Sequence, residues 1–318
     1  MAKNYRRYHK KAGKRKDGYE QITEQIIAAL DKGIVPWHKP WAKVAGHDHQ
    51  NLDGIAYRGI NTITLNMMAS INDYTDPRWG TYKAIAAKGG FVKGGEKGTK
   101  VIWISVIRQE CKPLHGEEEL CNTCLRSGKP NVDERWSNGV HTVFNVEQAG
   151  GLELPALDTV EPIAEFNPIE AAEAIVAGYK DRPAISYRGN SAFYTPSKDS
   201  ITLPEKWQFD GEDEYYSTLF HELTHSTGHK KRIGRHELEG VAPFGSKTYS
   251  KEELVAEFGN AFLCHESGIS STLDNSTAYI QGWAEKLRSD KKLVYQAAKA
   301  GQQAANYIQG IKEQAVDK

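Results

Sequence analysis

The chain has 318 residues, enough for two domains, and its 41 Lys+Arg balance 41 Asp+Glu, so the formal net charge is zero. No apolar run approaches the roughly 20 residues that a membrane-spanning helix needs, which excludes an integral membrane protein of helical type. No apolar segment follows the basic N-terminus, so we expect no signal peptide, a cytoplasmic location and four reduced cysteines.

The charges are unevenly distributed along the chain. Residues 1–110 carry 19 Lys+Arg and 10 Asp+Glu, whereas residues 111–318 carry 22 and 31. The first 18 residues hold eight basic residues and one acid. We expect them to form a disordered arm that either contacts phosphates or only increases solubility. A basic N-terminal half joined to an acidic half indicates a polyanionic partner.

Aromatic and basic residues alternate after the arm. Residues 19–32 are predicted to form a helix, and a second helix begins near Tyr57. This composition suits single-stranded nucleic acid, because an aromatic ring stacks on a base for about 1–3 kcal/mol while cations contact the backbone. The alternative is that individual tryptophans, above all Trp103, belong to the core. The predicted DNA-contacting residues are Trp37, Trp41, Tyr57, Arg58, Arg78, Trp79, Tyr82, Lys83, Lys93, Lys97 and Lys100.

Two predicted strands, residues 101–107 and 140–146, close an N-terminal domain that covers residues 19–150. Between them lies an insertion at about residues 109–138. It contains Cys111, His115, Cys121 and Cys124. The C-x-x-C pair has the spacing of half a structural zinc site, which the other two residues would complete. A loop of free thiols and a redox pair are the alternatives, because the chain has no second C-x-x-C.

Residues 151–165 have the composition of a linker, and residues 166–318 are predicted to form the second domain. A helix from Pro168 to about Tyr179 is followed by short strands and then by two further helical regions. A few short strands before a metal-bearing helix are the order expected of a minimal zincin-like fold. The sequence therefore predicts a two-domain α+β protein. The short strands are residues 183–188, 192–195 and 201–203, and the last helical region is residues 276–316.

The segment His221-Glu222-Leu223-Thr224-His225 is an H-E-x-x-H motif. Residues four apart lie on the same face of a helix, so the two histidines can bind one Zn²⁺ ion. Glu222 then lies beside the metal-bound water and acts as the general base of a metallopeptidase. The alternative is a pair of surface histidines on an amphipathic helix. Leu219 and Leu223 have helical spacing, and Gly228 is placed to end the helix, which favours the metal site.

A third ligand is expected downstream of this motif. The longer motif H-E-x-x-H-x-x-G-x-x-H fails, because its last position is Lys231. Glu253 and Glu257 are four residues apart in a predicted helix, and the pattern E-x-x-A-E is similar to the second motif of glutamate-type zincins. This resemblance implies that Glu253 binds zinc and that Glu257 orients a ligand histidine. The reverse assignment of the two acids stays open.

Taken together, these motifs resemble the ArdC antirestriction family of plasmids and phages. The resemblance implies an N-terminal domain that binds single-stranded DNA, a zincin-like metallopeptidase domain, and protection of incoming DNA from host restriction. A host protein such as a restriction component would be the peptidase substrate. The alternatives are a DNA-binding protein with a non-catalytic structural zinc, and a conjugative primase accessory. The matching segments are Pro36–Trp41, Tyr57–Asn61, Arg78–Tyr82, Gly90–Thr99, Val143–Gln148, Tyr194–Ile201, Phe220–Arg232 and Tyr249–Glu257.

Overall fold

The computed structural model describes residues 18–37, 47–110, 132–157, 168–235, 247–270 and 277–311. Its N-terminal half contains α1 (Gly18–Leu30), β1 (Gln50–Asn51), α2 (Ile60–Asn72), β2 (Arg78–Thr81), α3 (Tyr82–Ala87), β3 (Phe91–Val92), β4 (Thr99–Glu110), β5 (Val132–Asn145), the 3-10 turn η1 (Val146–Gln148) and β6 (Ala149–Gly150). Its C-terminal half contains α5 (Pro168–Gly178), β7 (Ala184–Tyr187), β8 (Phe193–Thr195), β9 (Ser200–Leu203), the 3-10 turn η2 (Lys206–Gln208), α6 (Glu212–Thr227), α7 (Lys247–Ser267), α8 (Thr277–Ser289) and α9 (Leu293–Ile308).

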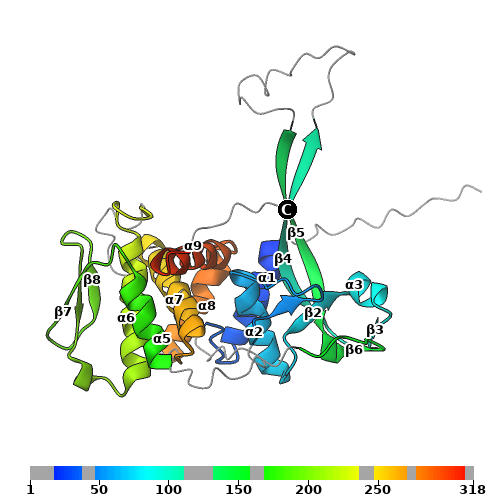
Figure 1. Ribbon diagram of the computed structural model, residues 1–318, viewed down its shortest axis with the longest axis horizontal. Helices are drawn as coiled ribbons and strands as arrows, with labels where there is room; N and C mark the ends of the chain where they lie inside the picture. Colours follow the sequence, from blue (N-terminus) through cyan, green and yellow to red (C-terminus); the bar gives the residue numbers. More distant parts are fainter. Residues whose placement is uncertain are drawn as a thin grey trace, which may run out of the picture.

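The N-terminal half is built on a four-stranded sheet with the order β1-β2-β5-β4. β1 pairs in parallel with β2, and the other pairs are antiparallel. α2 lies against β4, and its residues Leu65 and Ala69 meet Trp79 in a small separate core. A separate two-stranded sheet, β3 with β6, lies next to α3 at the far end of this half (Figure 1).

β4 and β5 form a hairpin that projects from the body of the protein (Figure 1). The two strands stay paired from Thr99↔Val143 to Glu110↔Val132. The predicted end of the first strand at residue 107 and the predicted start of the second at residue 140 were therefore wrong, because the strands continue to Glu110 and begin at Val132. The insertion at about residues 109–138 stays a prediction. Cys111, His115, Cys121 and Cys124 lie outside the described residues, so the second zinc site stays a prediction.

The C-terminal half places a small sheet beside a cluster of helices (Figure 1). The strand order is β7-β9-β8, with β7 parallel and β8 antiparallel to the central β9. α6 follows this sheet and packs against α7, which in turn packs against α9. The predicted order, short strands before the motif-bearing helix, is confirmed. Within the described ranges, each helix is too short or too polar to cross a bilayer.

The two halves share one hydrophobic core. Trp37 is completely buried, with its ring centroid 5.1 Å from that of Phe258 in α7 and 6.3 Å from that of Trp283 in α8. α1 packs against α8 and α9, and the Thr23 hydroxyl donates a hydrogen bond to the Lys291 carbonyl over 2.7 Å. The first helix, which the sequence analysis assigned to the N-terminal domain, therefore also belongs to the core of the C-terminal half.

The close approach of α7 and α9 requires a glycine. A Cβ atom at Gly301 would lie 2.7 Å from Cβ of Phe258 and 2.9 Å from the backbone nitrogen of Gly259. We expect Gly301→Ala to lower the free energy of unfolding, because overpacking against backbone costs about 1–3 kcal/mol and exceeds the helix propensity that alanine adds. Gly282 in α8 has no such neighbour within 4 Å, so Gly282→Ala is expected to raise stability by up to about 1 kcal/mol. Urea unfolding measures the free energy of unfolding of both variants. The same change in both would contradict the packing argument.

Candidate functional site

α6 carries the two histidines of the motif on one face. Leu219 and Leu223 are buried in the core, which fixes the rotation of the helix, and three acids in its first turn stabilise its positive end. The helix ends at Gly228, as the sequence predicts. With this rotation, the Nε2 atoms of His221 and His225 lie 3.1 Å apart and face the same point.

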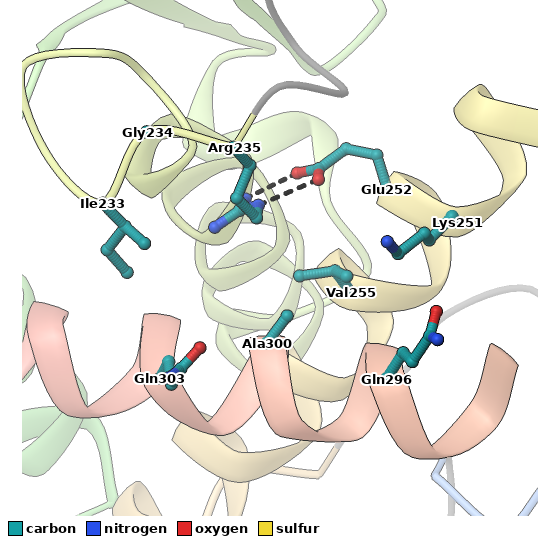
Figure 2. A pocket seen from close by; sticks show the side chains of 9 residues that line it. All are labelled: Ile233, Gly234, Arg235, Lys251, Glu252, Val255, Gln296, Ala300 and Gln303. Carbon is teal, nitrogen blue, oxygen red and sulfur yellow. Dashed lines mark hydrogen bonds and ion pairs between the residues drawn. The ribbon is translucent and has the colours of Figure 1, made fainter. Parts of the chain in front are cut away.

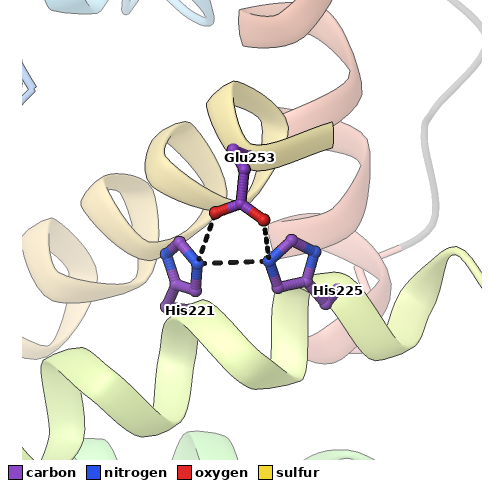
Figure 3. Close-up of side chains that lie close together, drawn as sticks. All are labelled: His221, His225 and Glu253. Carbon is purple, nitrogen blue, oxygen red and sulfur yellow. Dashed lines mark hydrogen bonds and ion pairs between the residues drawn. The ribbon is translucent and has the colours of Figure 1, made fainter. Parts of the chain in front are cut away.

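Glu253, near the start of α7, supplies a third donor to this point (Figure 3). Its Oε2 atom lies 3.6 Å from Nε2 of His221, and its Oε1 atom lies 3.5 Å from Nε2 of His225. Donors bound at about 2.0–2.2 Å to a tetrahedral zinc ion are separated by roughly 3.3–3.6 Å. The triangle formed by these three side chains therefore fits a zinc-sized divalent ion, and the described residues contain no other cluster of this kind.

The electrostatics of the site favour a bound cation. Burial lowers the pKa of His221, but its contact with Glu253 raises it. The negative charges of Glu257 and Glu222 add to this effect, and the net result is a pKa of about 9. Several carboxylates thus face one imidazole in a buried place, and a divalent ion neutralises them without a proton.

Glu222 is buried beside His221 on α6. Its carboxylate is close enough to raise the pKa of that histidine. This is the place that the sequence analysis gave to a general base, and that role stays a prediction. Glu257 is also buried and acts on His221 through its charge. Its predicted role in orienting a histidine likewise stays a prediction.

The carboxylate that lies at Nδ1 of His225 belongs to Glu252, whose role was not predicted from the sequence. Its Oε1 atom lies 3.3 Å from Nδ1 of His225. Burial raises the pKa of Glu252, but the hydrogen bonds from His225 and Arg235 hold it below its ordinary value. The signal in the sequence was the Glu252-Glu253 pair itself, because neighbouring helical residues diverge by about 100° and can reach two sides of one ring.

Two of the predicted DNA-contacting tryptophans belong to the core. Trp37 and Trp79 are completely buried, so neither ring can stack on a base. The indole Nε1 of Trp79 donates a hydrogen bond over 3.0 Å to Nδ1 of His49, whose pKa burial lowers to about 4. Trp103, which the sequence analysis regarded as the tryptophan most suited to the core, is instead 47% exposed on β4. Trp41 lies outside the described residues.

Other predicted contacts are partly engaged within the protein. Tyr57 is half-buried against the Trp79 core. The guanidinium of Arg78 pairs with Asp76 over 2.6 Å and donates to the carbonyl of Pro155. Lys93 donates to the Glu147 carbonyl, and Lys100 donates to the Thr142 hydroxyl. Arg58, Lys83 and Lys97 are exposed.

Besides Trp103 on β4, two exposed aromatic rings of the N-terminal half lie together at its far end. Tyr82, at the start of α3, is 62% exposed, and Phe91, in β3, is 59% exposed. The two elements contact each other (Figure 1). We call this region the α3–β3 surface and define it by Tyr82, Lys83, Lys88, Phe91, Lys93 and Lys97. Phe91 was missed from the sequence, although it lies in the same glycine-rich basic segment as Lys93.

Two family models match the chain. A model described as the N-terminal domain of anti-restriction factor ArdC matches residues 16–129, and one described as a zincin-like metallopeptidase matches residues 170–300. Crystal structures of the antirestriction ArdC protein from the R388 plasmid have the same fold. The metal-free form superposes with a TM-score of 0.68 and the Mn(II)-bound form with 0.67. Both are 32% identical to the chain and cover 93% of it and 98% of the plasmid protein.

Curated relatives extend the comparison. Two proteins named DNA primase TraC from Escherichia coli are 34% and 35% identical over 95% of this chain, but the match spans 28% and 20% of their own lengths. An uncharacterized protein, y4eC, of Sinorhizobium fredii is 32% identical over 92% of this chain and 91% of its own. The chain therefore belongs to the ArdC-like family, in which an ArdC-type N-terminal domain is joined to a zincin-like metallopeptidase domain.

Proposed function

We propose that this protein binds single-stranded DNA and carries a zinc-dependent peptidase centre, and that together these protect incoming DNA from restriction in the cytoplasm. The observation that carries the proposal is the triangle of donor atoms from His221, His225 and Glu253, with Glu222 buried beside it. The family model for an anti-restriction factor supports the biological role. The protein substrate would be a host component of restriction.

The three donors would hold the metal, and zinc is the ion that two imidazoles and one carboxylate in tetrahedral spacing suit. The Mn(II)-bound form of the R388 protein supports a divalent ion in general. A bound zinc ion lowers the pKa of its water from about 15.7 to about 7. The carboxylate of Glu222 would accept the proton of the attacking water and return it to the nitrogen of the leaving amine.

The α3–β3 surface is the proposed place of DNA contact. Its two exposed rings offer flat faces to unpaired bases, and its four lysines offer charge to the phosphates. Bases in a duplex are stacked on each other and cannot use these rings. We therefore expect the protein to prefer single strands, without strong sequence preference, and to bind less tightly as salt rises.

Tyr82→Ala is expected to weaken binding of a single-stranded oligonucleotide about 5- to 150-fold, because one stacked base contributes about 1–3 kcal/mol. The slope of log affinity against log salt should not change, since stacking displaces few counterions. Lys83→Gln should instead make that slope shallower by roughly 0.7. Fluorescence anisotropy at several salt concentrations measures both quantities on the intact protein.

Trp207→Ala is the matched control for Tyr82→Ala. Trp207 is 81% exposed, but it lies in η2 of the C-terminal half, away from the α3–β3 surface. Its loss should leave DNA affinity unchanged. If Trp207→Ala and Tyr82→Ala weaken binding equally, the effect is not specific to this surface and the proposed contact is wrong.

The biological role is tested by transferring unmodified plasmid DNA into a restricting host that does or does not produce the protein. More transformants in the producing host, and equal numbers in a host without restriction, are the expected result. The TraC relatives favour one alternative, a conjugative primase accessory. Primer synthesis that depends on adding the protein, without any protection of DNA, would support that alternative instead.

A further inference from the structure

A buried arginine holds the carboxylate that contacts His225. Arg235 forms two parallel contacts with Glu252: its Nη2 atom lies 2.6 Å from Oε1 and its Nε atom lies 2.9 Å from Oε2. Both side chains are almost fully buried. A bidentate pair of this kind fixes the plane of the carboxylate, and here one oxygen of that carboxylate also faces Nδ1 of His225.

The same guanidinium also holds the end of α6. Its Nη1 atom donates to the Thr227 hydroxyl over 2.7 Å, and its Nη2 atom donates to the Thr224 carbonyl over 2.9 Å. The backbone nitrogen of Arg235 donates to the Gly228 carbonyl. The Arg235 side chain thus links the last turn of α6, which carries His225, to the turn of α7 that carries Glu252 and Glu253.

The two histidines differ in their support. Nδ1 of His225 faces Glu252, whereas Nδ1 of His221 is buried without a hydrogen-bond partner among the described residues. A partner on Nδ1 fixes the tautomer that leaves the Nε2 lone pair free for a metal, and it sets the angle of the ring. The contact with Glu252 therefore orients the ring of His225, and the ring of His221 has no matching contact at Nδ1 among the described residues.

We propose that Arg235 is a positioning residue for the metal centre and acts through Glu252 on His225, so that it sets the affinity of the site for its ion. This inference rests on the metal centre of the proposed function. Arg235 does not touch the donor triangle. Its effect on metal affinity passes through the carboxylate of Glu252, and an experiment can detect whether the effect depends on that carboxylate.

The test is a zinc titration of the metal-free protein against a competing chelator. Arg235→Gln is expected to lower the affinity about 10- to 100-fold, the usual effect of removing support from a metal ligand. Glu252→Gln should lower it by a similar factor. If Arg235 acts through Glu252, the double variant should match Glu252→Gln alone, because the second change removes nothing further. Two independent losses that multiply would overturn the proposal.

Arg232→Gln is the matched control. Arg232 also forms a bidentate pair, partly buried, with Asp199, and it also donates to the end of α6, at the Ser226 carbonyl. Asp199 contacts none of the three donor residues; its closest imidazole is that of His229, at 3.9 Å. Arg232→Gln should therefore destabilise the fold without weakening zinc binding by the folded protein. Equal loss of affinity in both arginine variants would reduce Arg235 to a structural role.

A pocket of about 250 Å³ beside the pair offers a second readout (Figure 2). Arg235 and Glu252 line it, together with Lys251, Gln296 and Ala300. Arg235→Ala would open space next to this pocket for a small planar cation. Methylguanidinium at about 10 mM should then restore zinc affinity, because it reproduces the bidentate contact with Glu252, whereas methylammonium should not.

The outcomes separate this inference from the function on which it rests. If the unaltered protein binds no zinc, the proposed metal centre is wrong. If it binds zinc and neither Arg235 variant changes the affinity, only the positioning role is wrong. If circular dichroism shows that Arg235→Gln is unfolded, Arg235→Lys takes its place. The same loss of zinc affinity is expected, because a lysine cannot make the bidentate contact.

Discussion

Alanine at His221 or at His225 is expected to reduce zinc affinity about 200- to 5,000-fold. Structural zinc in zinc-finger peptides is bound with about 10–16 kcal/mol, and on that scale the loss of one of three protein donors should cost roughly 3–5 kcal/mol. Each variant should therefore lose its metal during dialysis against a weak chelator. Metal analysis of the intact, purified protein by mass spectrometry measures this directly.

His229→Ala is the control for this experiment. His229 follows the end of α6 by two residues, and its Nδ1 atom lies 3.9 Å from Asp199 rather than in the donor triangle. The His229→Ala variant should therefore keep its full metal content. Retention of zinc by all three histidine variants would mean that the ion, if one binds, is held elsewhere. Loss in all three would indicate general unfolding, which circular dichroism detects.

The meeting of His221, His225 and Glu253 at one point could be predicted from the sequence because helix geometry is local. The spacing of His221 and His225 fixes a common face wherever the helix lies, and Glu253 follows in a second periodic segment. The support of His225 could not be predicted in the same way. Arg235 reaches Glu252 across a turn and between the ends of two helices. Which carboxylate meets Nδ1 depends on how α6 and α7 pack, which no local pattern specifies.

For the aromatic residues, the sequence did not predict which side chains are buried and which are exposed. Composition alone could not separate Trp79, which the small core of the N-terminal half buries, from Tyr82, only three residues later and 62% exposed. β2 ends at Thr81 and α3 begins at Tyr82, so the alternation of side chains along the strand does not extend to Tyr82. The sequence also did not predict that the two halves share a core, in which Trp37 packs against Phe258 from the other half of the chain. Long-range packing decided each of these cases.

Glu222→Gln is expected to separate metal binding from catalysis. The amide has nearly the same size as the carboxylate, so the buried position beside His221 should tolerate it. All three metal donors remain, and zinc content should stay near that of the unaltered protein. The amide cannot accept a proton, and hydrolysis should fall about 10²- to 10⁴-fold, the usual contribution of a general base. Because the substrate is unidentified, cleavage is measured by mass spectrometry on proteins extracted from a restricting host.

The same variant decides whether hydrolysis is needed to protect DNA. Glu212→Gln is its control, an exposed acid in the first turn of the same helix. If the centre is catalytic, Glu222→Gln should lose protection in the transfer assay while keeping its affinity for single strands, and Glu212→Gln should keep both. Full protection by Glu222→Gln would instead assign the metal a structural role and leave DNA binding as the activity that opposes restriction. The two readouts are independent, because the α3–β3 surface and Glu222 lie in different halves of the chain.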